Sequence, residues 1–220
     1  MNYYNEYDKK AAAWLRELIR EGHVAPGVVD ERSILDVRPG DLTGFTQLHF
    51  FAGIGVWSYA LRRAGWPDSR PVWTGSCPRQ PFSNAGQRLG VADERHLWPH
   101  WFQLIVQCRP ADVLGEQVAS KDGLGWLDSV HADLEAAGYS VGAADLCAAG
   151  VGAPHIRQRL FFAAKSLDNT RRDGGQPDRL HLGGPTGRNG AAPGELQRVR
   201  ADGGPGILAG IVAHAEQHDR

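Results

Sequence analysis

The sequence lacks several features that would assign it to a protein class directly. No apolar run reaches the roughly 18 residues of a membrane-spanning helix, and the N-terminal segment is too polar for a secretory signal. The formal net charge is -1, so any contact with DNA must come from a local basic patch. The 3 cysteines fit neither a disulfide framework nor a zinc site. We expect a cytoplasmic protein with reduced thiols, without a metal and without membrane association.

Short apolar runs alternate with amphipathic stretches through most of the chain. This alternation predicts an α/β fold with a mainly parallel sheet. After residue 166 the composition turns to Gly, Pro, Arg and Asp, which predicts a flexible tail over 167–220. Residues 1–47 are expected to form an N-terminal helix and a connector, and 48–166 a central α/β domain. Strands are expected at 48–51, 72–74, 111–116, 139–146 and 159–164, and helices at 8–21, 56–64, 97–105 and 126–138.

Two loops that follow apolar runs carry the strongest chemical signal. The first, FAGIG at 51–55, lies between a predicted strand and a predicted helix. That pattern is typical of the first half of a nucleotide-binding βαβ unit. The alternative is a glycine turn that only packs a helix on a sheet. The second loop, GSCPRQPFS at 75–83, follows the next predicted strand.

Together these loops resemble motifs of the cytosine-5 DNA methyltransferases. In that family an early glycine loop holds S-adenosylmethionine, and a Pro-Cys-Gln-Pro-Phe-Ser loop holds the nucleophile. The family's cysteine thiolate attacks C6 of a flipped-out cytosine, which makes C5 nucleophilic enough to take a methyl group. Here Arg79 occupies that position, and a guanidinium is not a nucleophile. Cys77 is either a displaced nucleophile or a small buried apolar side chain.

Further motifs extend the resemblance over roughly residues 48–164. Glu116 begins a match to Glu-Asn-Val, whose glutamate holds the N3 and N4 edge of cytosine, and partial burial there would raise its pKa. The segment 152–159 resembles Gly-Val-Pro-Gln-x-Arg-x-Arg, with Arg157 and Arg159 on one face for phosphate and base contacts. The alternatives are a salt-bridged rim carboxylate and two solvated arginines. By resemblance the cofactor residues are Phe51, Ala52, Gly53, Ile54, Gly55, Pro78 and Leu97, whereas Trp98 and Trp101 are expected in the core.

Some family elements are absent from their usual place. The family has a second strand ending in an acid that holds the cofactor ribose, and then a third strand near the adenine. Between Gly55 and Gly75 there is room for about one helix, so we expect both strands to be deleted. The strand at 48–51 should then be a central strand with 72–74 on one side, close to a sheet edge that the N-terminal segment covers. The helix at 8–21 should lie where the family has a C-terminal helix. Asp68 is a candidate for the missing acid, and cofactor binding is expected to be weak.

Three functions are compatible with these motifs. The first is a DNA cytosine methyltransferase that uses S-adenosylmethionine, with C5 chemistry dependent on residue 79. The second is a catalytically inactive DNA-binding or interaction module of the same fold. The third is methylation of an exocyclic amine, which needs no cysteine, although the loop at 77–80 departs from the Pro-Pro-aromatic pattern of such enzymes. We also expect Arg79 to pair with Glu116 and keep it ionised.

Overall fold

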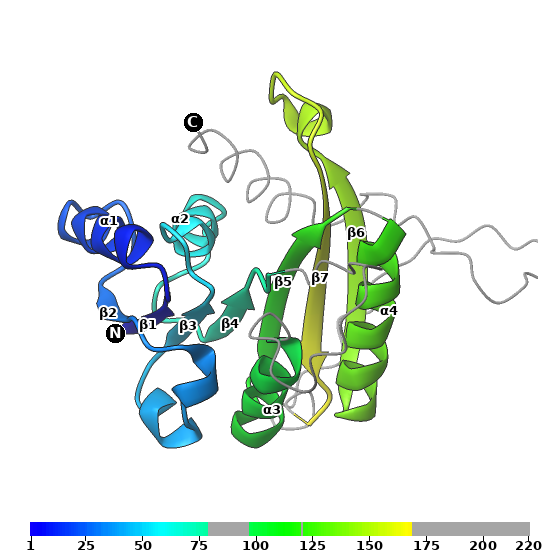
Figure 1. Cartoon of the computed structure of the whole chain (residues 1–220), viewed down its shortest axis with the longest axis horizontal. Helices are drawn as coiled ribbons and strands as arrows, with labels where there is room; N and C mark the ends of the chain where they lie inside the picture. The colour runs from blue at the N-terminus through cyan, green and yellow to red at the C-terminus, as the bar shows by residue number, and fades with distance from the viewer. Residues whose placement is uncertain (79–96, 120, 169–220) are drawn as a thin grey trace, which may run out of the picture.

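The computed structural model describes residues 1–78, 97–119 and 121–168, which form one mixed α/β sheet (Figure 1). The strands are Asn2–Asn5 (β1), Gly27–Asp30 (β2), Gln47–Phe50 (β3), Val72–Gly75 (β4), Asp112–Val118 (β5), Tyr139–Cys147 (β6) and Gln158–Ser166 (β7). Their order is β2-β1-β3-β4-β5-β7-β6, and β7 is antiparallel to both neighbours while the other pairs are parallel. The predicted α/β class with a mainly parallel sheet is confirmed.

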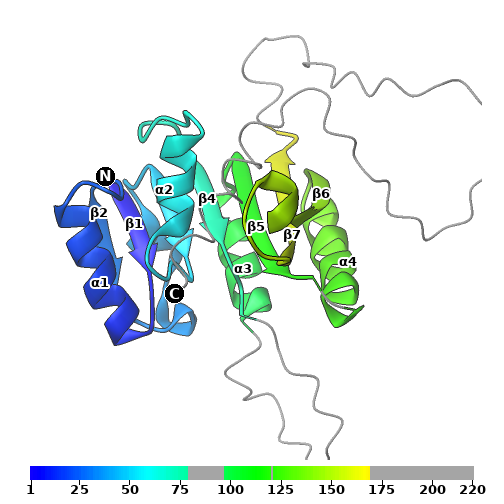
Figure 2. The ribbon, with the colours of Figure 1, turned by 90° about the horizontal axis from the view of Figure 1, so that it is seen from above.

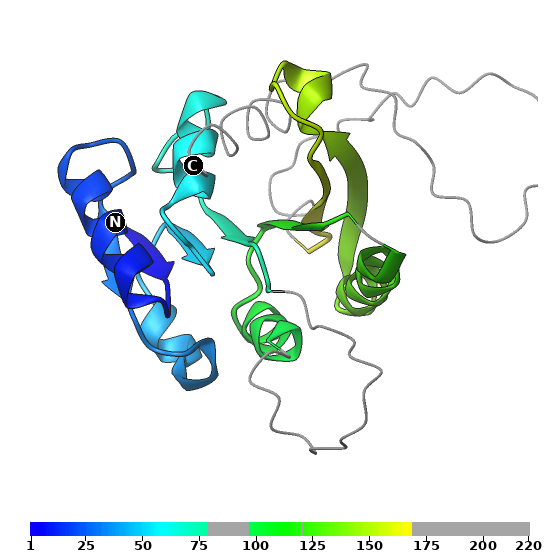
Figure 3. The same ribbon diagram turned by 45° about the horizontal axis from the view of Figure 1, so that its top comes forward.

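Helices cover both faces of this sheet, as Figures 2 and 3 show. One face carries α1 (Lys9–Arg20) and α2 (Val56–Arg63), because Tyr4 of β1 packs on α1 and bonds to α2. The other face carries the 3-10 turns η1 (Ile34–Asp36) and η2 (Pro39–Leu42) with α3 (Trp98–Cys108) and α4 (Lys121–Ala136). A further 3-10 turn, η3 (Ala148–Val151), follows β6. In the described ranges no helix is both long and apolar enough to span a membrane.

The first two strands are the main departure from the sequence-based expectation. Residues 1–47, expected to hold a helix and a connector, also supply β1 and β2 to the sheet. The N-terminal segment covers the edge beside β3, as expected, but it does so by adding two strands, and β3 is a central strand with β4 on its other side. The polarity of β1 concealed it, because its buried asparagines are satisfied by specific partners. Asn2 donates to Oε1 of Gln47 at 3.1 Å, and Asn5 donates to the carbonyl of Arg32 at 2.8 Å.

The strands expected to be deleted are thus replaced by strands from a different part of the chain. β1 and β2 lie on the side of β3 where the family's second and third strands are expected, but they precede β3 in sequence. Helix α1 is the crossover between β1 and β2. Its expected place, where the family has a C-terminal helix, stays a prediction. No strand lies between β3 and β4 in the sequence, as expected, but the sheet does have two strands on the other side of β3, which was not expected.

This reordering gives one connection an unusual hand. The β1-α1-β2 and β3-α2-β4 units move in opposite directions across the sheet, yet α1 and α2 lie on the same face. The β2-to-β3 and β4-to-β5 connections move across the sheet in the same direction as β3-α2-β4. Their described elements, η1 and η2 in the first and α3 in the second, lie on the opposite face from α2. The β3-α2-β4 crossover therefore has the opposite hand from the other three. Because parallel crossovers are right-handed in about 98% of cases, we assign the left hand to β3-α2-β4.

The segment that carries β1 and β2 closes on itself. The N–H of Thr46 donates to the carbonyl of Met1 at 3.0 Å, immediately before β3 begins. The N–H of Gln47 donates to the side-chain oxygen of Asn2 at 3.3 Å. The two ends of residues 1–46 therefore lie side by side at the amino-terminal edge of the sheet.

Two glycines allow aromatic rings to lie directly on the sheet. Gly75 and Gly115 are register partners in β4 and β5. A Cβ atom at Gly115 would lie 2.1 Å from the ring of Phe162, and one at Gly75 would lie 2.6 Å from the ring of Trp101. Neither position has room for a side chain, so both glycines are required by packing in the core.

We expect Gly115→Ala to lower the free energy of unfolding by about 1–3 kcal/mol, because the buried Phe162 ring must move to admit a methyl group. Urea unfolding would measure the change. The matched control is Gly142→Ala in β6, where an added Cβ would meet no atom within 4 Å. Equal stability of the two variants would contradict this packing.

Candidate functional site

The predicted site residues gather at the carboxyl ends of the central parallel strands. The glycine turn at 51–55 follows β3, Ser76 to Pro78 follow β4, and Glu116 lies near the end of β5. In open α/β sheets, ligands bind outside this edge. Arg79 lies outside the described residues, as does the rest of its loop up to residue 96.

The turn after β3 has an uncommon backbone conformation. Phe51, Gly53 and Gly55 all have positive φ angles, of 53°, 55° and 82°. For a bulky residue such as Phe51 this left-handed conformation costs about 1–3 kcal/mol, and such residues concentrate at ligand sites. A Cβ at Gly55 would lie 2.7 Å from Leu15 of α1, whereas one at Gly53 would meet nothing within 4 Å. The turn therefore packs against α1 at Gly55 and leaves space beside Gly53.

The acid beside this turn was missed in the sequence. Glu6 directly follows β1, and its carboxylate accepts the N–H of Gly53 at 2.6 Å and the N–H of Asp8 at 2.8 Å. A carboxylate has about four acceptor positions, so Glu6 can receive further donors. Asp68 is no substitute, because its carboxylate pairs with Arg62 at 2.7 Å in the loop that precedes β4. The available signal was the tyrosine pair of β1, which leads into an acidic residue before a capped helix.

The acid that ends β2 is already engaged. Asp30 accepts the hydroxyl of Tyr3 at 2.7 Å and the guanidinium of Arg32 at 2.7 Å. Arg32 also pairs with Asp41 of η2 at 3.1 Å. This network ties the ends of β1 and β2 to η2, and it leaves Glu6 with more free acceptor capacity than Asp30.

Glu116 is held on the α2 side of the sheet by a basic side chain of the neighbouring strand β7. Nε of Arg159 lies 2.6 Å from its Oε1. Burial is the largest influence and raises the pKa of Glu116, as expected. The positive charges of Arg159 and Arg157 oppose this effect and lower the pKa of Glu116. The described partner of Glu116 is therefore Arg159, and the expected pairing with Arg79 falls outside the described residues.

Cys77 is buried, with 3% of its surface exposed, and burial raises the pKa of its thiol to about 12. At neutral pH it is therefore a thiol rather than a thiolate nucleophile. This favours the small apolar side chain over the displaced nucleophile. Gln117, itself buried, donates to the carbonyl of Cys77 at 3.1 Å and so fixes the start of the loop, in which Pro78 is exposed.

The aromatic residues of α3 belong to the core rather than to a ligand site, as expected. Trp98 and Trp101 are buried in the largest hydrophobic cluster, and Leu97 packs against that cluster. Leu97 is thus placed beside the core, and its proposed contact with the cofactor remains a prediction.

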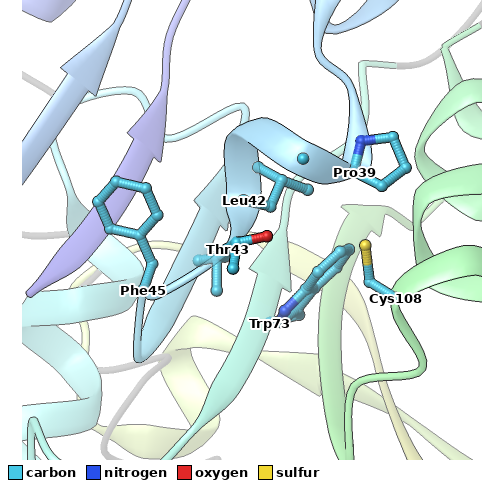
Figure 4. A pocket seen from close by; sticks show the side chains of 8 residues that line it. Pro39, Leu42, Thr43, Phe45, Trp73 and Cys108 are labelled. Atoms are coloured by element: carbon cyan, nitrogen blue, oxygen red, sulfur yellow. The ribbon is translucent and has the colours of Figure 1, made fainter.

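A cavity of about 450 Å³ lies on the α3 face of the sheet, at the end of α3 (Figure 4). It is lined by Pro39, Gly40, Leu42, Thr43, Phe45, Leu48, Trp73 and Cys108. None of these is a predicted cofactor residue, so this cavity is not the expected cofactor site. Within residues 1–78, 97–119 and 121–168, no group of three or more His, Cys, Asp or Glu is placed to hold a metal ion.

His49 of β3 is fully buried beneath α2. It stacks on Tyr4, and its Nδ1 lies 2.7 Å from Oγ1 of Thr74. Its Nε2 has no hydrogen-bond partner among the residues that the structure describes, and burial lowers its pKa from 6.5 to about 3. The ring is therefore neutral in the folded chain at every pH near neutrality.

We expect the free energy of unfolding to fall as the pH falls below 6.5, because the unfolded chain then takes up a proton that folded His49 binds only near pH 3. The slope due to His49 approaches about 1.4 kcal/mol per pH unit between these values, and above pH 6.5 it vanishes. Denaturant unfolding at pH 7.5 and 5.5 measures it. His49→Gln should reduce the dependence, whereas His23→Gln, at an exposed position, should retain it. Identical slopes for wild type and His49→Gln would contradict this account.

The fold and the site define an α/β protein in which a glycine turn follows β3 and a carboxylate–arginine pair lies near the end of β5. A family model for the C-5 cytosine-specific DNA methylase matches residues 67–181, just over half of the sequence. The chain belongs to this family. The match begins after α2, so the reordered strands β1, β2 and β3 lie outside it.

Similar proteins include two type II methyltransferases. M.BspRI of Lysinibacillus sphaericus is 38% identical over 98 residues, which are 43% of this chain and 23% of that protein. M.AgeI of Thalassovita gelatinovora is 31% identical over 118 residues, which are 52% of this chain and 27% of that protein. A solved DNMT2 mutant of Spodoptera frugiperda shares 14% identity with a TM-score of 0.47, over 75% of this chain and 50% of that chain. The chain spans about a quarter of the length of the curated relatives it matches.

Proposed function

We propose that this chain binds S-adenosylmethionine and a flipped-out cytosine of DNA at the carboxyl edge of its sheet, as a DNA cytosine methyltransferase whose C5 chemistry is limited by Arg79. The observation that carries the proposal is the pairing of Glu116 with Arg159 at 2.6 Å, beside the loop that follows β4. These are the two residues that, by resemblance, contact the base. Their placement at the same edge of the sheet as the glycine turn after β3 supports one site for base and cofactor.

The residues around the turn fit the cofactor. S-adenosylmethionine is the methyl donor of this family, and when bound it would supply the methyl group. The free acceptor positions of Glu6 suit the two ribose hydroxyls, and the space beside Gly53 allows a ligand to approach the backbone. Tyr7, which is 73% exposed directly after Glu6, offers an aromatic face for the adenine. The expectation of weak binding rested on a missing acid, and Glu6 removes that reason.

Glu116 would recognise the cytosine by its protonation state. A protonated carboxyl can donate to N3 of cytosine while its other oxygen accepts from the N4 amine. Burial raises the pKa of Glu116 and so increases the protonated fraction, while Arg159 holds the carboxyl in place. The same carboxyl, if fully ionised, would lack the donor for N3.

Residue 79 decides how far the reaction proceeds. A guanidinium at the cysteine position cannot attack C6, so we expect binding of cofactor and base with little or no C5 transfer. An inactive DNA-binding module is the second candidate function, and Arg79 itself is the observation that favours it.

The test is a calorimetric titration with S-adenosylmethionine, followed by transfer of a labelled methyl group to DNA of mixed sequence. Cofactor binding with weak or no transfer is the expected result. Efficient transfer would show that the chain is an active enzyme despite Arg79. Binding to DNA without binding to cofactor would support the inactive module, and the absence of both would overturn the proposal.

A further inference from the structure

Two consecutive phenylalanines at the end of β3 pack on the same face of the sheet. Phe50 is fully buried in the cluster on the α3 side, and Phe51 packs against that same cluster. The residues before them alternate normally, because Leu48 joins this cluster whereas His49 stacks on Tyr4 beneath α1 and α2. Regular alternation would send Phe51 to the face of His49. The ring of Phe51 therefore reaches the α3 side through a change in the backbone.

The left-handed conformation of Phe51 is that change. Its φ angle is 53°, which is unfavourable for a bulky residue and persists only where surrounding contacts hold it. The next residue, Ala52, is buried with Leu15 on the α1 side, and its N–H donates to the carbonyl of Asn5 at 3.0 Å. The turn is thus anchored to both faces, and the strained residue is the one that faces α3.

The ring that meets Phe51 on the α3 side is Trp101. The two rings pack edge to face, with centroids 6.0 Å apart and planes at 87°, a favoured geometry for aromatic pairs. Trp101 is fully buried, and it lies on Gly75 at the end of β4, where an added Cβ would come within 2.6 Å of the indole. The indole has no room to move toward β4, so it gives Phe51 a fixed support.

Trp101 contributes its ring rather than a hydrogen bond. Its Nε1–H is buried and has no hydrogen-bond partner among residues 1–78, 97–119 and 121–168. A buried indole N–H normally has a partner, and a phenylalanine would avoid leaving this donor unsatisfied. What tryptophan adds over phenylalanine in the described structure is therefore a larger ring, which reaches Phe51 from α3.

We propose that Trp101 is a positioning residue for the cofactor site and holds Phe51 in the left-handed conformation of the glycine turn. Its effect on S-adenosylmethionine rests on the proposed function, but the support of Phe51 does not. Trp101 is fully buried, so it acts through Phe51 and not by touching a ligand. Without this support we expect about a tenth of the molecules to keep the turn, which lowers the affinity for S-adenosylhomocysteine about tenfold in Trp101→Leu.

A double-mutant cycle separates positioning from general stability. Glycine adopts positive φ angles without strain, so Phe51→Gly removes the need for support. By calorimetry, Trp101→Leu should weaken binding about tenfold in the wild-type background and less than about twofold in the Phe51→Gly background. A role in core stability alone would give equal losses in both. The matched control is Trp73→Leu, which removes a buried indole that packs on Phe50 at 5.0 Å and should leave the affinity unchanged.

NMR of the full chain without ligand gives a second readout. The backbone chemical shifts of Phe51 distinguish a left-handed from an extended residue. They should move toward extended values in Trp101→Leu and stay in place in Trp73→Leu. If Trp101→Leu does not fold, Trp101→Phe should change the same shifts in the same direction by a smaller amount. If Phe51→Gly binds too weakly for the cycle, this comparison decides.

Two outcomes would overturn the proposal. One is a folded Trp101 variant in which the Phe51 shifts do not change, and the other is an equal loss of affinity in both backgrounds of the cycle. The expected shift changes in a chain that binds no S-adenosylhomocysteine would sustain the support of Phe51 by Trp101 and overturn only the proposed function.

Discussion

Arg79→Cys should convert a chain that forms no covalent bond to DNA into one that is trapped on DNA containing 5-fluorocytosine. The new thiolate can attack C6 of the flipped base, after which C5 takes the methyl group from the cofactor. Fluorine then occupies the place of the proton whose removal would release the protein, so the sulfur–carbon bond persists. A denaturing gel with labelled DNA and S-adenosylmethionine detects the complex.

Three variants make this experiment decisive. Arg79→Ser has nearly the size of the cysteine variant but no thiolate, so it should give no complex. Cys77→Ser should not affect trapping in the Arg79→Cys background, because Cys77 is buried and protonated. A complex with wild type that disappears in Cys77→Ser would instead make Cys77 the nucleophile. No complex in any variant would favour the inactive module.

Glu6→Ala should lower the affinity for S-adenosylhomocysteine by roughly a hundredfold or more. Each hydrogen bond to a charged group contributes about 1.5–3 kcal/mol, and the ribose offers two hydroxyls. Since about 1.4 kcal/mol corresponds to a tenfold change in affinity, the loss of both is well within calorimetric range. Glu6→Gln, which keeps an acceptor for the N–H of Gly53, should show a smaller loss.

The control for charge is Glu17→Ala, because Glu17 lies on α1 and pairs with Arg20 away from the turn. Thermal unfolding of each variant separates a lost ligand contact from a disordered turn, since Glu6 also binds the backbone of Gly53 and Asp8. Wild-type affinity in a folded Glu6→Ala variant would show that another group receives the ribose.

Local sequence patterns predicted the strands and helices whose apolar residues recur at regular spacing. They missed a strand in which buried polar side chains pair with distant residues. β3, β4 and β5 were recognisable because each is an apolar run followed by a glycine or polar loop. β1 was not, because Asn2 and Asn5 interrupt its hydropathy and are satisfied by partners more than 20 residues away. The order of strands in a sheet depends on such distant contacts, so a local reading could not supply it.

The site residues were likewise only partly predictable from the sequence. Motif spacing indicated Glu116, Arg157 and Arg159, and the structure places Arg159 in contact with Glu116. Glu6 was missed because the acid was sought after the glycine turn, in a segment that holds only α2 and the entry to β4. The hydrogen bond from Trp57 to Ser76 was also not predictable, since the two residues are 19 positions apart and meet only through the left-handed crossover.

The contact between Met1 and Thr46 gives residues 1–46 the character of a cassette. Both ends of residues 1–46 lie at the same place on the edge of the sheet. A gene could therefore encode this cassette before or after β3, the strand that leads into the glycine turn, with few changes in the connections and with the same neighbours in space. The family match begins only at residue 67, after this cassette and β3, so the segment with the unusual strand order is also the segment that the family pattern does not cover.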